Sequence, residues 1–459
     1  MNPERIHHAW HSILNAPIDG TYVTAKTVEA VCEDLQRSTA CTLEQIGTSK
    51  QGRPVQALAI GDGTTVITIK GNAHADEPTG IITCIQLVRL LKDHPDWRPL
   101  LDRFRFCLVP TANPDGLARN QGWLSSSFSL EQYFRHVYRD LPQNDVEFGY
   151  PSDAAEIEGV RPENVACARF FDACAPIASH ISLHSMVFTG GAWFLLSGSE
   201  DPGFVEPVIT FLTSACRDIS LPLHDEDRGG QRGFARIAPG FHTIPTVEGM
   251  QTFFKQSGNT ALTSQFRLNS MQYNMRFNDA RYTAVSELPY AYDSNLADMT
   301  ATDLPRPDLE RQRAEIQVEV LDELAKIIEE TGDYASTEEG QFRLGYYREY
   351  LSYRRAGHAS LTRDLDRFSH LKATTRDLHE VRLLLLRHRV YNVAAALQIL
   401  QGNTSSDAQA LRQSYEKVYQ VRFDGMINTF QFTLLPVEAL VRLQLASILA
   451  GLLIASLDG

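Results

Sequence analysis

The feature that most constrains the fold of this chain is the alternation of short β-rich runs with helical stretches between about residues 40 and 300. VITIK (66–70) is typical of a buried strand, and the next stretch has apolar residues at 81, 85 and 88, the spacing of one helix face. Pro78 suits the start of that helix. Further strands are expected at FRFCLVP (104–110), HISLH (180–184), AWFLLSG (192–198) and TAVSELP (283–289). This alternation predicts an α/β fold with a mixed, largely parallel central sheet flanked by helices.

Near residue 300 a polar, proline-containing joint is followed by long helical patterns with few strand signals. We therefore predict two domains, an α/β domain over residues 1–300 and an all-helical domain over residues 301–459. The longest uncharged apolar run, at 444–457, is too short to cross a bilayer unaided, so we expect a core helix or a subunit interface there. The C-terminal helices are thus a candidate surface for a homo-oligomer.

Charge and cysteine usage narrow the partners and the compartment. The chain has 43 basic and 56 acidic residues, a net charge of -13, which argues against nucleic-acid binding and against a basic stripe for anionic membranes. Its seven cysteines are an odd number without a C-x-x-C pair, which favours a reducing compartment over a disulfide framework. The N-terminus shows no apolar signal-peptide pattern. We expect a cytoplasmic protein without a membrane span.

A candidate metal pair lies in the loop after the strand at 66–70. His74 and Glu77 are three residues apart, so both side chains can reach one ion from a single turn. Zinc accepts imidazole nitrogen and carboxylate oxygen, and a third ligand would still leave a fourth position for water. The pair also follows a predicted strand, where α/β sheets build their sites. On its own, however, the pattern also fits a solvated turn with an acidic residue before Pro78.

The residues around this pair resemble those of a known family, the zinc carboxypeptidases (M14 peptidases). That family shows a Gly-Arg-Pro turn, a strand pair and then Gly-x-x-His-x-x-Glu. The same order is found here in Gly52-Arg53-Pro54, Gly71, His74, Glu77 and Gly80. The turn Asn113-Pro114-Asp115-Gly116 matches the family's Asn-Pro-Asp-Gly turn, and Ser182-Leu183-His184-Ser185 resembles the strand end that supplies a third ligand.

The resemblance implies that residues 1–300 form a catalytic domain and that His74, Glu77 and His184 hold one zinc ion per chain. His180 is a rival third ligand, because side chains on a strand alternate and His180 therefore shares a face with His184. The Leu-His-Ser context favours His184.

Peptide hydrolysis at zinc also needs a carboxylate that takes a proton from water and passes it to the leaving amine. In the family this glutamate lies on a late strand and is commonly followed by leucine, which points to Glu287, with Glu248 as the alternative. The developing oxyanion needs a fixed cation or donor. Arg139 matches the family's arginine by position, and Arg119 and Arg135 are the alternatives.

One departure from the family concerns the end of the substrate. The family clamps the terminal carboxylate with an Asn-Arg pair, and an arginine fork is the natural reader of a carboxylate. No Asn-Arg dipeptide occurs in this chain, and Gly149 and Tyr150 are assigned to the pair's places. Other candidates for the missing groups come from different segments: Arg161, Arg228 and Arg232 for the carboxylate, and Tyr273 and Tyr282 for the family's mobile tyrosine.

The sequence therefore predicts a zinc-dependent hydrolase of a peptide or small amide, with uncertain specificity for the end group. A chemically adjacent alternative is an N-acyl amino acid deacylase of the aspartoacylase and succinylglutamate desuccinylase kind, although the Asn-Pro-Asp-Gly turn favours a peptidase. A different class, a catalytically inactive scaffold with the helical region as its interaction surface, is kept open by the absence of the Asn-Arg pair.

Overall fold

The computed structural model describes residues 3–124, 127–153, 157–198, 201–225, 233–256, 263, 266–358 and 365–456. Its centre is a ten-stranded sheet with nine strands in the order β1-β2-β4-β3-β5-β9-β6-β8-β7 and β12 paired with β9. The strands are β1 (Thr42–Thr48), β2 (Pro54–Ile60), β3 (Thr65–Gly71), β4 (Phe104–Val109), β5 (Ile177–Thr189), β6 (Trp193–Leu196), β7 (Arg236–Ala238), β8 (Phe241–Thr243), β9 (Tyr282–Tyr292) and β12 (Thr433–Leu434).

The middle of the sheet is parallel, and this is what creates a site. The neighbours β4, β3, β5 and β9 all run in the same direction, while β1 and β2 extend the sheet in antiparallel fashion. Parallel strands end at the same edge of a sheet, so the loops that follow them meet there. The expected α/β fold with a mixed, largely parallel sheet is confirmed.

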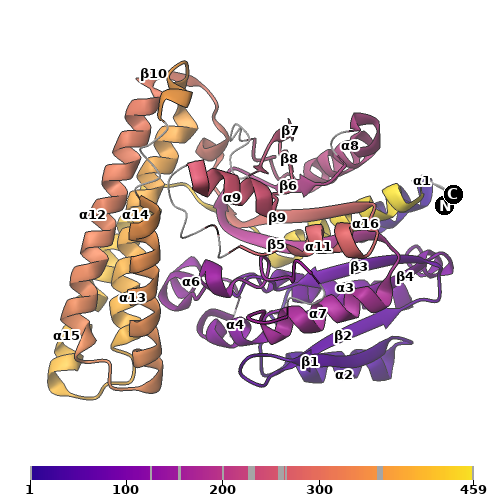
Figure 1. Ribbon diagram of the computed structural model, residues 1–459, viewed down its shortest axis with the longest axis horizontal. Helices are drawn as coiled ribbons and strands as arrows, with labels where there is room; N and C mark the ends of the chain where they lie inside the picture. The colour runs from indigo at the N-terminus through magenta and orange to yellow at the C-terminus, as the bar shows by residue number, and fades with distance from the viewer. Residues whose placement is uncertain are drawn as a thin grey trace.

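Helices cover both faces of the sheet (Figure 1). One apolar core joins the sheet to α1 (Pro3–Ile13), α2 (Val28–Ser38), α3 (Thr79–Asp93), α8 (Pro202–Asp218) and α16 (Val437–Ser456). A second core, on the other face, includes side chains from α7 (Pro162–Cys174), α9 (Val247–Gln256) and the neighbourhood of α11 (Ser270–Phe277). The sheet is therefore buried on both faces, as its apolar strands require.

Pro78 and the Asn113-Pro114-Asp115-Gly116 segment each mark the beginning of a helix. Pro78 is the N-cap of α3, as its fixed backbone angle predicts. The Asn-Pro-Asp-Gly segment is not a simple turn, because it begins the short helix α4 (Pro114–Arg119). Asn113 caps that helix by accepting a hydrogen bond from the amide of Gly116 at 2.9 Å. Two more short helices follow, α5 (Gln121–Leu124) and α6 (Leu130–His136).

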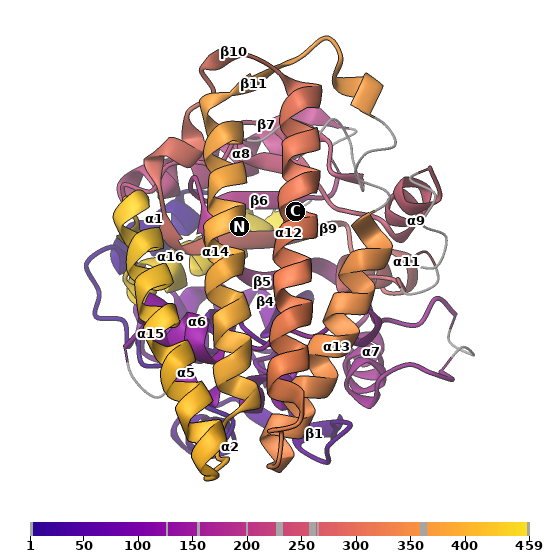
Figure 2. The same cartoon turned by 90° about the vertical axis from the view of Figure 1, so that its left-hand side faces the viewer.

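The C-terminal region is helical, as predicted. Four long helices, α12 (Arg306–Gly332), α13 (Glu338–His358), α14 (Thr375–Ile399) and α15 (Ser406–Thr429), stand side by side along one end of the sheet (Figures 1 and 2). A short strand pair, β10 (Ala301–Pro305) with β11 (Lys372–Thr374), lies at one end of this group. Short 3-10 turns complete the elements: η1 (Arg98–Asp102), η2 (Pro142–Asn144), η4 (Ser294–Ala297) and η5 (Leu365–Phe368).

The last helix, α16, lies apart from these four helices and packs on one face of the sheet, against β5, β9, α3 and α8. It is the one helix in the described part of the chain that is long and apolar enough to cross a membrane, but 94% of its most apolar window is buried inside the protein. Gly451 allows the close approach, since a Cβ atom there would lie 3.1 Å from Ile181. α16 is therefore a core helix of the sheet. The domain boundary at residue 300 stays a prediction.

Candidate metal centre

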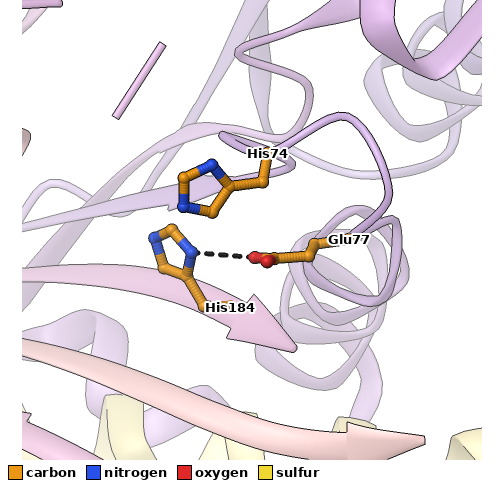
Figure 3. Close-up of side chains that lie close together, drawn as sticks. All are labelled: His74, Glu77 and His184. Atoms are coloured by element: carbon orange, nitrogen blue, oxygen red, sulfur yellow. Dashed lines mark hydrogen bonds and ion pairs between the residues drawn. The ribbon is translucent and has the colours of Figure 1, made fainter. Parts of the chain in front are cut away.

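Three side chains, two from the loop after β3 and one from the middle of β5, converge at the carboxyl edge of the sheet (Figure 3). One ligand atom each from His74, Glu77 and His184 lies within 4.8 Å of the others. The side chain of His74 is 10% exposed, and those of Glu77 and His184 are 2% exposed. Two imidazoles and a carboxylate, all nearly buried, are a donor set that suits zinc and leaves a coordination position for water.

Strand register explains why distant residues meet here. β3 pairs with β5 so that Gly71 lies opposite Leu183, which places the loop after β3 beside His184. Gly71 and Gly80 permit the tight return of this loop, because a Cβ atom on Gly80 would lie 2.9 Å from the Cα atom of Gly71. His74 and Glu77 are thereby held next to His184, which follows Glu77 by 107 positions in the sequence.

Glu77 has three polar partners around its carboxylate. Its carboxylate lies 2.8 Å from Nδ1 of His184 and accepts hydrogen bonds from Arg139 at 2.7 Å and from the amide of Ser185 at 3.3 Å. Burial alone would raise the pKa of this carboxyl, but the neighbouring His74 and Arg139 lower it well below the ordinary value. Glu77 is thus held ionised, the form that binds a metal.

His74 and His184 differ in their surroundings. Burial and the cation of Arg139 lower the pKa of His74 well below its ordinary value, so His74 is a neutral, metal-binding imidazole. Burial acts in the same direction on His184, but the carboxylates of Glu77 and Glu147 outweigh it and raise its pKa to about 10. The site therefore holds a positive charge between carboxylates, which is the place a metal cation would take.

Glu147 is the site residue that the sequence did not reveal. Its Oε2 atom lies 2.5 Å from Nζ of Lys70, 3.1 Å from Nε2 of His184 and 3.1 Å from Oγ of Ser182. Its other oxygen accepts hydrogen bonds from the hydroxyl and the amide of Ser270, at 2.7 and 3.1 Å. A histidine that binds a metal through one nitrogen commonly donates its other N–H to a carboxylate.

Two features of the sequence could have indicated this residue: a lysine, Lys70, in a largely apolar strand, and the acidic residue itself in DVEFGYP. Lys70 is fully buried, and a buried ammonium needs a partner. The resemblance to the family places the equivalents of its Asn-Arg pair at Gly149 and Tyr150 instead. Tyr150 packs in an apolar core beneath Lys70, and a Cβ on Gly149 would clash with Asn164, so neither lines the metal cluster.

Glu287 lies beside the cluster from a third strand. On β9 it is the direct partner of His184 on β5, so the two side chains leave the sheet on the same face. Its Oε2 atom is buried and has no hydrogen-bond partner among the described residues. Burial raises its pKa to about 8, against the lowering effect of His184. Glu248, the alternative, is on α9 and bonds Arg276 and Gln272 instead.

Arg139 reaches the cluster from the loop after α6. One guanidinium nitrogen donates to Glu77 and, at 3.1 Å, to Asp76, while 45% of the side chain remains exposed. Tyr133 anchors Asp76 by donating to its other oxygen at 2.7 Å. Among the predicted arginines, Arg139 is thus the one at the site, because Arg119 pairs with Glu339 and Arg135 with Glu131 and Glu416.

The remaining candidates are engaged elsewhere. The ring of His180 lies between Thr68 at 2.8 Å and Ser270 at 3.1 Å, four residues before His184 on β5. Arg161 is committed to Glu163, Asp140 and the carbonyl of Asn144. Tyr273 donates to Asp172, and Tyr282 is buried against Phe204. Arg228 and Arg232 lie outside the described residues.

The C-terminal helix also supports the site. Gln444 of α16 donates to the backbone carbonyl of His184 at 3.1 Å and accepts from Thr83 of α3 at 2.5 Å. A polar side chain inside the apolar run at 444–457 is therefore explained by its hydrogen bonds, as burial requires. The position of His184 depends in this way on a segment about 260 residues away in the sequence.

Comparison with known proteins agrees with this geometry. The family model described as zinc carboxypeptidase (Peptidase_M14) matches residues 28–186, which include His74, Glu77, Arg139 and His184. This match confirms the resemblance to the zinc carboxypeptidase family over that part of the chain. A zinc peptide hydrolase is accordingly the class of protein that the match supports. Glu287 lies beyond the matched residues.

Solved structures show more distant likenesses. Carboxypeptidase A from Helicoverpa armigera is 13% identical with a TM-score of 0.39, covering 62% of this chain and 71% of that one. Bovine thrombin-activatable fibrinolysis inhibitor, solved with a tick carboxypeptidase inhibitor, is 16% identical with a TM-score of 0.36, covering 58% and 86%. Scores of this size add nothing to the assignment. No curated protein sequence matches the chain at a significant level.

Proposed function

We propose that the protein hydrolyses peptide or amide bonds with one zinc ion per chain held by His74, Glu77 and His184. The observation that carries this proposal is the convergence of these three ligand atoms within 4.8 Å at the carboxyl edge of the sheet. When bound, zinc polarises the scissile carbonyl as a Lewis acid and lowers the pKa of a water molecule. The residues around it supply the rest of the chemistry.

Glu287 is the proposed general base and acid. Its buried oxygen has no hydrogen-bond partner among the described residues, so it is available to a water or a substrate. It takes a proton from the attacking water at a carboxylate oxygen and then donates that proton to the leaving amine nitrogen.

Arg139 and Glu147 are the proposed supporting groups. The half-exposed guanidinium of Arg139 is placed to donate to the oxygen on which negative charge develops. Glu147 accepts from Nε2 of His184 and so fixes the ring with Nδ1 facing Glu77 and the metal position. Lys70 keeps Glu147 ionised, since burial acts to raise the pKa of Glu147 but the buried ammonium lowers it.

Metal analysis and hydrolysis of a peptide panel test this proposal. We expect about one zinc per purified chain, and loss of hydrolysis on chelation with recovery on adding zinc. The panel holds peptides with a free C-terminus, C-terminal amides and N-acyl amino acids. His74→Ala is expected to lose both the metal and the activity. A native protein that is free of metal and hydrolyses no member of the panel with added zinc would refute the proposal.

The compartment and the assembly are further parts of the proposal. All seven cysteines are free and buried, which supports a reducing, cytoplasmic environment. The C-terminal helices are the proposed homo-oligomer surface, and exposed apolar side chains on α15, such as Val421 at 73% exposure, support this. Light scattering of the native protein and of a Val421→Glu variant tests it, because only an oligomer through α15 would dissociate.

A further inference from the structure

Three arginines from three helices gather in the C-terminal region. Arg313 lies on α12, Arg354 on α13 and Arg387 on α14, and each is partly buried. The three helices pack against one another, and His358 of α13 bonds the carbonyl of Ala314 of α12 at 3.0 Å, next to Arg313. Burial lowers the pKa of the Arg387 guanidinium, and the nearby positive charges of Arg313 and Arg354 lower it further.

In the part of the chain that the structure describes, these arginines have no acidic partners. Within the described residues none of the three forms an ion pair, and Nε of Arg387 is buried without a hydrogen bond. Arg354 donates a hydrogen bond to the hydroxyl of Tyr350 at 2.9 Å, and its guanidinium lies 5.5 Å from the centre of that ring. Nearby arginines of the same helices are paired: Arg389 with Glu319, and Arg355 with Asp322.

Arg387 lies on the face of α14 that packs against α6, and Arg139 of the metal centre follows α6 in the sequence. Arg387 is one helical turn before Tyr391, so both side chains project from the same face of α14. The ring of Tyr391 lies 4.6 Å from that of Phe134 on α6, and the preceding residue of α6, Tyr133, donates a hydrogen bond to Asp76. Asp76 shares Arg139 with Glu77. α14 and α6 also lie side by side in Figure 2.

Three like charges that are partly removed from water destabilise the fold unless an anion joins them. A chain with 56 acidic residues supplies none to these three within its described part, although their neighbours are paired. Guanidinium groups bind carboxylates through paired hydrogen bonds. A carboxylate-bearing ligand at this cluster would therefore satisfy the orphaned donors.

We propose that Arg313, Arg354 and Arg387 form a binding site for a carboxylate of the substrate, supplied by the helical region to the metal centre. The proposal rests on the proposed hydrolase function. It assigns the selection of acidic or C-terminally free substrates to residues of the helical region, outside the loops that follow the sheet strands. The helical region then has a role in specificity.

Binding to the zinc-free protein tests the site without hydrolysis. The probes are acetyl-Ala-Ala-Ala with a free C-terminus, its C-terminal amide, and acetyl-Ala-Ala-Glu amide, which carries only a side-chain carboxylate. By calorimetry we expect at least one carboxylate probe to bind about tenfold or more tightly than the neutral amide, as for hydrogen bonds to charged groups. The two carboxylate probes show which source the site takes.

Arg387→Gln and Arg354→Gln should each abolish this preference. Arg389→Gln is the matched control, because Arg389 is on the same helix but already paired with Glu319. Equal binding of all three peptides to the native protein, or a preference that survives in both variants, would overturn the proposal. Tighter binding of inorganic phosphate than of either carboxylate peptide would also overturn the carboxylate assignment.

Thermal unfolding separates a binding role from a structural one. Without ligand, Arg387→Met removes an uncompensated charge, so its unfolding midpoint should equal or exceed that of the native protein. A clear fall in the midpoint would mean that Arg387 stabilises the fold, and would overturn the proposal. Because neither measurement uses zinc or turnover, the carboxylate site can fail while the hydrolase proposal stands, and the reverse.

Discussion

The carboxyl edge of the sheet and the arginine cluster of the helical region handle buried charge in opposite ways. At the sheet edge, Glu77 and Glu147 each accept several hydrogen bonds, and a cation lies beside each of them. In the helical region, Arg313, Arg354 and Arg387 have no ion-pair partner among the described residues. The difference indicates a site built to hold a cation and another built to hold an anion.

At the sheet edge Glu287 differs from Glu77 and Glu147, because one of its buried oxygens lacks a hydrogen-bond partner among the described residues. It resembles Arg387 in this respect. Each has a buried side-chain atom, Oε2 and Nε respectively, without a hydrogen-bond partner among the described residues. A buried polar atom left unsatisfied costs free energy, so its retention suggests a functional role. The predictions below test whether the paired and unpaired groups have the different roles assigned to them.

The largest effect is expected from Glu287→Gln, which removes the proton acceptor but keeps the shape of the side chain. Hydrolysis of the best peptide should fall by about 10² to 10⁴-fold in kcat, with zinc content unchanged. Steady-state kinetics and metal analysis measure the two quantities. Glu248→Gln is the control and should retain full activity, since Glu248 pairs with Arg276. The opposite pattern would move the general base to α9.

Glu147→Gln should act on metal binding first. Removing the carboxylate behind His184 is expected to weaken zinc affinity by about 10 to 100-fold, measured by competition with a chelator. Glu163→Gln is the matched control, because Glu163 is also buried and ion-paired, with Arg161, but does not contact the cluster. Equal zinc affinities for the two variants would show that Glu147 only stabilises the fold around Lys70.

The pH dependence of the protein's stability tests whether the carboxyl group of Glu287 is buried away from water. Burial raises the pKa of this carboxyl from its ordinary 4.5 to about 8, so the folded protein keeps the proton more tightly than the unfolded chain. The stability this provides is complete below pH 4.5 and is lost as the pH rises to about 8.

In the zinc-free protein, Glu287→Gln should therefore match the native unfolding midpoint near pH 4.5 and exceed it at pH 9. Calorimetric scans at several pH values would measure it, and a difference that does not grow with pH would show that Glu287 is well solvated.

The smallest effect is expected at a satisfied pair on the surface. Arg389 and Glu319 are 39% and 55% exposed, and such pairs contribute at most about 1 kcal/mol. Arg389→Gln should therefore lower the free energy of unfolding by less than this amount in urea titrations. A loss of several kcal/mol would mean that arginine pairing organises the helical region, and would weaken the contrast with Arg387.

The sequence by itself determined the features that depend on neighbouring residues. The alternation of strands and helices, the start of α3 at Pro78, and the pairing of His74 with Glu77 all follow from local spacing. The match to the zinc carboxypeptidase family agrees with these local motifs. Local spacing is reliable here because a turn or a helix start is settled within a few residues.

Tertiary structure decided what depends on register and on distant contacts. Pairing of β3 with β5 places His184 beside the loop of Glu77 and leaves His180 opposite Thr68. Other distant residues also meet. Glu147 contacts Lys70, 77 positions away, and Gln444 of α16 supports His184 from 260 positions away. The three arginines come from three different helices. Such contacts are invisible in the sequence, because only the folded sheet and its packed helices bring these charges together.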